Sequence, residues 1–273
     1  MSTTTEWVRY GDQLGYLAHP ERAAPPLPAV LVIQEIWGVD AHIQDVTRRF
    51  AAAGYAALAP DLYAEHGQRP DELTPERIAE LQAFMTGLPP AAWQDPQARD
   101  AEVAKLPEAK QSAIRATHTT LFAGIAAGSS GLARFVAPLL AATRYLRHEH
   151  DATRGQRVGC VGFCMGGGLS ALLACNDPEL SAAAVFYGSA PPLGEVARIQ
   201  CPVLGLYGGL DERINAGIPA LEAAMKQAGK SFEAHVYPGA MHSFFNDTRA
   251  SYHVGAARDA FARTLELFRR TLS

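Results

Sequence analysis

The 273-residue sequence has no apolar run near the roughly 18 residues that a bilayer-spanning helix needs. Its first residues, MSTTTEWVRYGDQ, are polar and lack the apolar segment of a secretory signal peptide. These two absences predict a protein of the cytoplasm that has no membrane as a partner.

An excess of charge of one sign is also missing. The sequence has 24 basic and 28 acidic residues, for a net charge of −4, and its lysines and arginines are scattered rather than gathered in a stripe. Nucleic acids and anionic membranes are therefore poor partners. A composition that is 48% apolar and 19% charged is instead typical of a globular protein.

Cysteine is scarce, and its spacing excludes the common metal and redox motifs. Cys160, Cys175 and Cys201 lie in apolar stretches without zinc or C-x-x-C spacing, so we expect buried, reduced thiols. Residues 148–151, His-Glu-His-Asp, could hold a metal, but they lie at a polar helix end where cationic residues suit the helix dipole. We interpret them as a solvated surface and expect neither a metal nor a cofactor.

Short apolar runs alternate with amphipathic segments along most of the chain. Several runs lack polar alternation, which is typical of parallel strands covered on both faces. This pattern predicts a mostly parallel, doubly wound α/β sheet with helices on both faces and an antiparallel hairpin at one edge. The expected strands are 29–33, 55–59, 158–163, 183–187, 202–207 and an edge strand at 232–237; the hairpin covers 7–18, and the main helices cover 43–53, 132–147 and 253–272.

The segment from about residue 64 to residue 130 breaks this alternation. It is polar, holds several prolines and contains two short helical patterns, at 75–87 and 112–127. Such a segment is too small and too weakly apolar to form its own core. We therefore expect one domain, residues 1–273, with this segment as an insertion packed over the carboxyl ends of the strands.

Residues 161–168, VGFCMGGG, have the form of the G-x-S-x-G turn that presents a nucleophile, with Cys164 in place of the serine. The turn joins a strand to a helix, where side chains at Gly162 or Gly166 would collide with the crowded backbone. The helix N-terminus favours the thiolate, and the Met165 N–H points towards any oxyanion formed beside the sulfur. Taken alone, the motif also fits an inert cysteine in a glycine-rich turn.

The chain also supplies a base and an acid in the order nucleophile, acid, histidine. Asp211 follows the strand ending at residue 207, and His242 follows the strand ending at residue 237. All three residues are thus expected at the same edge of the sheet. We predict a triad in which Asp211 orients His242 and His242 exchanges protons with Cys164, with Glu212 as the alternative acid.

Five motifs together resemble one family. They are Q-E-I-W-G at 34–38, P-D-L-Y-A at 60–64, G-F-C-M-G-G at 162–167, G-G-L-D at 208–211 and A-M-H-S-F at 240–244. The chain resembles the dienelactone hydrolases, or carboxymethylenebutenolidases, which are cysteine-dependent α/β-hydrolases. The resemblance implies the α/β-hydrolase fold, an ester or lactone as small-molecule substrate, a thioester acyl-enzyme and no cofactor.

The resemblance also implies further site residues. Glu35 would lie beside the thiol and help to convert it to the thiolate, although a salt-bridged structural glutamate is the alternative from the residues alone. The N–H of Ile36 would join that of Met165 in an oxyanion hole. Trp37, Tyr63 and Ser243 are weaker candidates for contacts with substrate.

One departure from the family pattern concerns the charge of the substrate. The family binds a carboxylate with arginines, one of them in H-S-F-x-R, where this chain has Asn246. Arg249 lies three residues further on and could reach the site. The second family arginine should come from the divergent region, where the candidates are Arg69, Arg77, Arg99 and Arg115.

A neutral amide lacks the charge pairing that favours a carboxylate. A neutral or bulkier ester, lactone or thioester is therefore at least as good a candidate as the original lactone. Two alternatives stay open: a broad carboxylesterase or thioesterase on the same triad, and a non-catalytic scaffold with a redox-sensitive thiol. The sequence does not indicate an oligomeric state.

Overall fold

The strands form a single eight-stranded sheet in a computed structural model that describes residues 2–89, 92, 95–126 and 131–273. Their spatial order is β1-β2-β4-β3-β5-β6-β7-β8. The bounds are β1 (Thr3–Tyr10), β2 (Gln13–Pro20), β3 (Ala29–Ile33), β4 (Ala56–Pro60), β5 (Val158–Phe163), β6 (Ala182–Phe186), β7 (Val203–Gly208) and β8 (Phe232–Tyr237).

The sheet is mostly parallel, as the sequence predicts. Strands β3 to β8 pair in parallel, whereas β2 is antiparallel to both β1 and β4. The predicted hairpin is β1–β2 at one edge, and the predicted edge strand is β8 at the other. Parallel strands bring their carboxyl ends to one edge of the sheet, where loops from separate parts of the chain can meet.

Strand β3 shows why the sequences of the central strands are continuous apolar runs. Ala29, Leu31 and Ile33 belong to the cluster on one face of the sheet, whereas Val30 and Val32 belong to the cluster on the other, and all five are fully buried. Because successive side chains of a strand point to opposite faces, both faces demand apolar residues.

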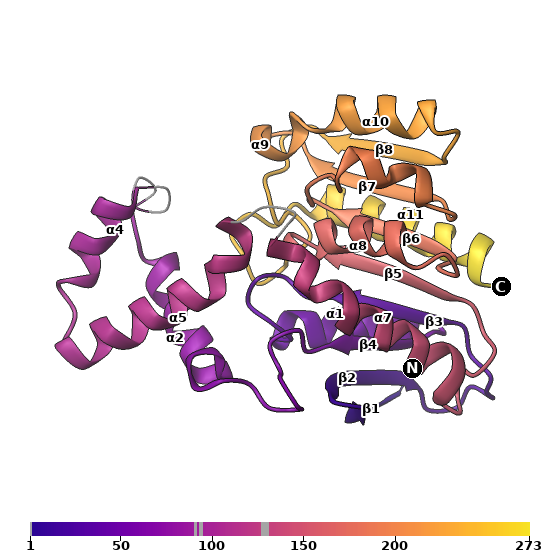
Figure 1. Cartoon of the computed structure of the whole chain (residues 1–273), viewed down its shortest axis with the longest axis horizontal. Helices are drawn as coiled ribbons and strands as arrows, with labels where there is room; N and C mark the ends of the chain where they lie inside the picture. Colours follow the sequence, from indigo (N-terminus) through magenta and orange to yellow (C-terminus); the bar gives the residue numbers. More distant parts are fainter. Residues whose placement is uncertain (1, 90–91, 93–94, 127–130) are drawn as a thin grey trace.

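Helices cover both faces of the sheet (Figure 1). On one face, α1 (Ala41–Ala52) packs on β2, β3 and β4, and α11 (Val254–Leu272) packs on β5, β6 and β7. On the other face, α7 (Val136–Arg144) packs on β2 and β4, α8 (Met165–Asn176) on β3, β5 and β6, and α10 (Ile218–Gln227) on β8. Two short helices, η4 (Leu193–Arg198) and α9 (Glu212–Asn215), lie in the connections beside them.

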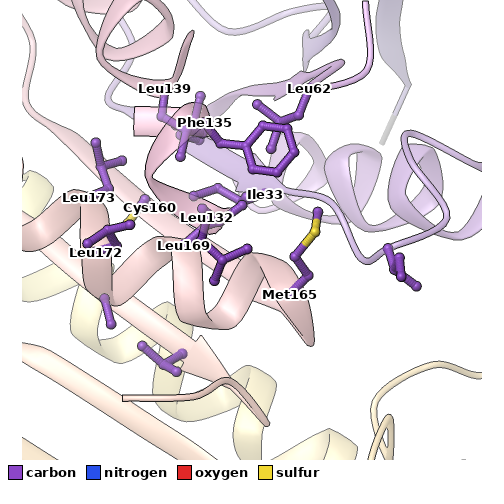
Figure 2. Close-up of a cluster of buried hydrophobic side chains, with 14 of the residues drawn as sticks. Ile33, Leu62, Leu132, Phe135, Leu139, Cys160, Met165, Leu169, Leu172 and Leu173 are labelled. Carbon is purple, nitrogen blue, oxygen red and sulfur yellow. The ribbon is translucent and has the colours of Figure 1, made fainter. Parts of the chain in front are cut away.

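The apolar cluster beneath α7 and α8 fixes the end of α8 that carries the candidate cysteine. Figure 2 shows leucines of both helices packed with Ile33 of the sheet and with Met165 at the start of α8. Burying this much apolar surface is the main stabilising contribution to the position of α8. The labelled members are Ile33, Leu62, Leu132, Phe135, Leu139, Cys160, Met165, Leu169, Leu172 and Leu173.

The predicted helix over 132–147 is divided into three stretches. A 3₁₀ turn, η2 (Ala133–Phe135), precedes α7, and a π-helical turn, η3 (Tyr145–Glu149), follows it. Phe135, Leu139, Ala142 and Leu146 are nevertheless all buried, as their spacing predicts. The buried face was therefore predicted correctly, although the backbone hydrogen bonding changes along it.

The described part of the segment after β4 is mainly helical and lies beyond the carboxyl ends of the strands (Figure 1). Its helices are η1 (Asp71–Leu73), α2 (Pro75–Thr86), α4 (Pro96–Val103) and α5 (Glu108–Ala126). Helix α4 was not predicted from the sequence: its Asp95 cap is present, but Val103 is its only buried residue, so it has no apolar periodicity. None of the described helices has the length and hydropathy that crossing a bilayer requires.

Candidate active site

Cys164 occupies a strained corner between β5 and α8. Its φ and ψ are 56° and −113°, a conformation that residues other than glycine rarely adopt. Its N–H donates to the Phe186 carbonyl at 3.1 Å, which ties the corner to β6. A Cβ atom on Gly162 would lie 1.9 Å from the carbonyl oxygen of Gly166, so the collision expected from the sequence is present.

Two further loops meet at this edge because glycine lets their backbones touch. A Cβ atom on Gly208, at the end of β7, would lie 2.6 Å from the carbonyl oxygen of Met241. The N–H of Leu210 donates to the Ala240 carbonyl at 2.9 Å. The loop after β7 and the loop after β8 are thereby held side by side.

These loops bring Asp211 and His242 into contact. Nδ1 of His242 lies 2.5 Å from Oδ2 of Asp211, whose side chain is buried. Glu212, the alternative acid, is exposed at the start of α9 and has no hydrogen bond to His242 among the described residues. His242 also shares a hydrogen bond with the Cys164 side chain, so the imidazole lies between the predicted nucleophile and the predicted acid.

The electrostatics of His242 follow from these two contacts. Burial lowers the pKa of His242, but hydrogen bonds to Asp211 and Cys164 and the negative charges of both groups raise it, to about 10. The imidazole is therefore protonated at neutral pH and lies between a carboxylate and a sulfur. A cation in that position stabilises a thiolate next to it.

Glu35 is almost fully buried, at 3% exposure, and both of its carboxylate oxygens accept hydrogen bonds. The Tyr187 hydroxyl donates to Oε1 at 3.2 Å, and Nδ2 of Asn246 donates to Oε2 at 3.0 Å. Both donors are neutral, and in the described part of the chain Glu35 forms no ion pair. The salt-bridged structural glutamate considered from the sequence is therefore not observed.

Sequence reasoning missed Tyr187. It lies directly after β6 with a φ of 39°, it packs edge-on against the His242 ring at 5.1 Å, and its hydroxyl binds Glu35. Burial raises the pKa of Tyr187, and the charges of Glu35 and Cys164 raise it further, so the phenol stays a proton donor. Its place after a buried strand at the carboxyl edge was the one available signal.

A cavity of about 250 Å³ opens beside Cys164 and His242. Most of its wall is apolar, and among the described lining residues Arg213 carries the one permanent charge. Arg213 forms no hydrogen bond or ion pair with any group in the described ranges. The lining residues are Leu132, Cys164, Met165, Gly168, Leu172, Tyr187, Ser189, Ala190, Pro191, Pro192, Arg213, Ile214 and His242.

The three weaker candidates for substrate contacts do not line this cavity. Trp37 is buried against the Phe122 ring at 6.3 Å and lies under the Arg249 guanidinium at 5.6 Å. Tyr63 is buried, with its hydroxyl on a backbone carbonyl. Ser243 has a φ of 62° and turns the chain directly after His242. Packing occupies the Trp37 side chain and a backbone carbonyl binds the Tyr63 hydroxyl, so the structure does not bring these candidates to the cavity.

The candidate arginines of the divergent region do not line the cavity either. Arg69 forms a buried ion pair with Asp61 at 2.7 Å, and Arg77 links α2 to α5 through the Ala113 carbonyl at 2.9 Å. Arg99 and Arg115 line a separate hollow between α2, α4 and α5. Arg249 lies over Trp37, as described above. Among the described lining residues, the one arginine at the cavity is therefore Arg213, which the sequence analysis did not single out.

The two N–H groups expected to bind an oxyanion lie on adjoining elements. Met165 is the first residue of α8, so its N–H has no acceptor within the helix. Ile36 follows β3, and its N–H has no acceptor among the described residues. A Cβ atom on Gly166 would lie 2.3 Å from the Ile33 carbonyl oxygen, so the glycine brings the first turn of α8 against the end of β3.

Residues 14–272 match the dienelactone hydrolase family. The chain belongs to this family. The chain is similar to a Saccharolobus solfataricus protein named "Putative carboxymethylenebutenolidase", to which it is 36% identical over 268 residues, 93% of each chain. An Escherichia coli relative of the same name is 33% identical over 272 residues, 95% of this chain and 83% of its own.

The fold of this dienelactone hydrolase family member agrees with a solved structure. The crystal structure described as "Putative Dienelactone Hydrolase" from Klebsiella pneumoniae has a TM-score of 0.70 and 29% identity, and the match covers 98% of this chain and 99% of the other. The α/β-hydrolase fold implied by the sequence motifs is thereby confirmed. In the described residues, no three His, Cys, Asp or Glu side chains converge as metal ligands would.

Proposed function

We propose that this protein is a cysteine hydrolase of carboxylic ester or lactone bonds. The observation that carries the proposal is the contact of His242 with Asp211 on one side and with Cys164 on the other, at a strained corner that opens into a cavity. A nucleophile, a base and an orienting acid in this arrangement define covalent acyl transfer. The names of the curated relatives, which are those of a lactone hydrolase, support the same reaction class.

The reaction begins when the Cys164 thiolate attacks the carbonyl carbon of the substrate. The N–H groups of Ile36 and Met165 stabilise the tetrahedral oxyanion. The intermediate collapses, the C–O bond breaks, and the leaving alkoxide takes a proton from His242. The acyl group is now a thioester on Cys164, and in a lactone it stays joined to the new hydroxyl group.

Water then cleaves the thioester. His242, now neutral, removes a proton from the water, and the resulting hydroxide attacks the thioester carbonyl. The second tetrahedral oxyanion accepts hydrogen bonds from the same two N–H groups. The C–S bond then breaks, and the carboxylic acid leaves. The Cys164 thiolate and the protonated His242 are restored. Asp211 stays ionised throughout and holds His242 in the required orientation.

We assign to Glu35 the thiol-activating role that the resemblance implies. Neutral donors hold the carboxylate in a buried place, where a charge without a cationic partner is costly. Tyr187 links Glu35 to the triad, because its hydroxyl binds Glu35 and its ring packs against the His242 ring at 5.1 Å.

The cavity favours substrates with a small, mainly apolar body. Its volume of about 250 Å³ is below the range of drug-sized pockets, and most of its wall is apolar. Asn246, which replaces the family arginine, is bound to Glu35 and does not line the cavity. This supports an ester, lactone or thioester whose recognition does not depend on an arginine at that position.

The proposal is tested by Cys164→Ala on a panel of lactones, esters and thioesters. We expect kcat/KM to fall by about a thousandfold or more while the fold is kept, because the covalent route is lost. Cys175→Ala is the matched control, since this thiol lies in α8 outside the cavity. Turnover retained within a few-fold by Cys164→Ala would refute the proposal, and a wild type that turns over none of the panel would favour the non-catalytic scaffold.

A further inference from the structure

The Tyr63 hydroxyl contacts both residues that would supply the oxyanion hole. It donates to the Ile36 carbonyl at 2.7 Å, and its oxygen lies 3.9 Å from Sδ of Met165. Tyr63 is 4% exposed and does not line the cavity beside Cys164. The side chain is therefore out of reach of substrate but in contact with both halves of the predicted oxyanion hole.

The hydrogen bond to Ile36 is a firm one. A phenol has one proton to donate, and the carbonyl oxygen is a nearer and stronger acceptor than the thioether sulfur. Burial raises the pKa of Tyr63, so the hydroxyl keeps its proton throughout the neutral range. The contact with Met165 is then one of packing between the phenol and the thioether.

Tyr63 is itself held by a buried ion pair. Its N–H donates to Oδ1 of Asp61 at 3.2 Å, and Oδ2 of Asp61 is 2.7 Å from Nε of Arg69. The Arg69 guanidinium also packs against Gly38, where a Cβ atom would lie 2.9 Å from Nη2. The Asp61–Arg69 pair therefore contacts both the turn that contains Ile36 and Tyr63, whose hydroxyl binds Ile36.

Hydrogen bonds fix both peptide planes that flank Ile36. The Glu35 carbonyl accepts from the Gly38 N–H at 3.3 Å, and the Ile36 carbonyl accepts from Tyr63. Because a peptide is planar, holding the Glu35 carbonyl also aims the Ile36 N–H on the other side of the same plane. Holding the next plane prevents the backbone at Ile36 from rotating away.

We propose that Tyr63 is a positioning residue for the oxyanion hole: its hydroxyl orients Ile36, and its packing on Met165 keeps the two N–H groups at a constant separation. The inference rests on the proposed function. It assigns to Tyr63 an effect on the transition state alone, since the oxyanion forms only there and preorganised donors act on developing charge.

The test compares Tyr63→Phe with Tyr16→Phe. The control removes a hydroxyl that also has one hydrogen bond, to Arg48 at 3.1 Å, and that lies on β2, with no contact to the cavity. Two reactions of Cys164 are measured in each variant: acylation by an activated ester, from the burst of released alcohol, and alkylation by iodoacetamide. Acylation forms an oxyanion, whereas alkylation at a saturated carbon does not.

We expect acylation to fall about tenfold or more in Tyr63→Phe, somewhat less than the loss of a whole oxyanion donor. Alkylation should stay within twofold of wild type, since the contacts of His242 with Cys164 and Asp211 are untouched. An aldehyde inhibitor, which forms a tetrahedral adduct on the thiol, should bind weaker by a similar factor to the loss in acylation. Tyr16→Phe should change none of the three.

Acylation unchanged in Tyr63→Phe would overturn the inference, and so would acylation and alkylation that fall together. The substitution keeps the ring and removes one hydrogen bond, so a folded variant is expected and is checked by thermal unfolding. The proposed function fails by a separate result, Cys164→Ala that still turns over. The two failures are therefore distinguishable.

Discussion

Asn246 has a different role in the structure from the one suggested by its place in the sequence. Its Nδ2 donates to Glu35, while its Oδ1 accepts from the Thr248 N–H at 3.1 Å and from the Thr248 hydroxyl at 2.7 Å. An amide suits this place because it is a donor at one end and an acceptor at the other. A guanidinium could bind Glu35 but could not accept from Thr248. Asn246, which stands where the family has an arginine, therefore uses both ends of its amide in hydrogen bonds within the protein.

The individual site residues were predictable to different degrees. Cys164, Asp211 and His242 each follow a recognisable strand, and the parallel sheet brings such positions to one edge. The partners of Glu35 were not predictable, because Tyr187 and Asn246 are 152 and 211 residues away from it and neither belongs to a motif that states the contact. Pairings of this kind depend on loop conformations, including a positive φ at Tyr187, that no periodicity encodes.

The raised pKa of His242 predicts a pH-dependent stability. The pKa is 6.5 ordinarily and about 10 in the folded protein, so the folded state binds the proton more tightly than the unfolded state does. The stabilisation is complete below pH 6.5 and is lost as the pH rises through 10. We therefore expect the free energy of unfolding of wild type to exceed that of His242→Gln most near pH 6, and the excess to shrink steadily up to pH 10.

Denaturant unfolding of the two proteins at intervals between pH 6 and pH 10 measures this difference directly. The range spans the ordinary and the raised pKa of His242 and stays above the titration of ordinary carboxyl groups. Asp211→Asn removes one of the two charged partners of His242, so it should lower the pKa of the imidazole in the folded protein. The excess in the free energy of unfolding should then decline over a narrower pH range. An excess that does not vary with pH would contradict the assigned contacts of the imidazole.

At the level of elements, burial decided which predictions succeeded. The central strands are buried on both faces and read as apolar runs, and their predicted ends lie within one residue of the observed ones. Helix α11 is amphipathic, and it begins at Val254, one residue after the predicted start. Helix α4 has one buried residue and was missed, since apolar periodicity appears only where a helix packs on a core.

The turn between β5 and α8 provides a sharp test of element packing. A Cβ atom on Gly162 would lie 1.9 Å from the Gly166 carbonyl oxygen and 2.6 Å from Oγ of Ser170. The first neighbour is backbone of a helix that is buried along all but its last residue, so it cannot move aside. Gly162→Ala should therefore destabilise the protein by about 3 kcal/mol, the upper end of ordinary overpacking, and displace Cys164 enough to remove activity.

The matched control is Gly194→Ala in η4, where a Cβ atom would meet nothing within 4 Å and φ is not positive. Its effect should stay within about 0.5 kcal/mol, because no neighbour has to move. The free energies of unfolding come from urea titrations of both variants. Equal effects at the two glycines would contradict the crowding of the corner at Gly162.

For the whole molecule, the main question is whether residues 64–130 form part of the same folding unit. Leu81 and Met85 of α2 and Ile114 of α5 belong to the same apolar cluster as Leu31 and Ile33 of the central sheet. The segment therefore shares the core of the protein instead of building its own. The single domain of residues 1–273 stays a prediction, and a core shared between the segment and the sheet is what it requires.

A shared core has a measurable consequence for unfolding. Leu81 is fully buried, so Leu81→Ala should cost about 2–5 kcal/mol and lower the unfolding temperature of the entire chain in one transition. Thr119→Ala, at an exposed position of α5, is the control and should change it little. Calorimetry follows the unfolding of both the segment and the sheet. Loss of esterase activity during heating follows the sheet, which carries the candidate site. Two separate transitions, with activity lost only in the second, would mean that the segment unfolds independently of the sheet.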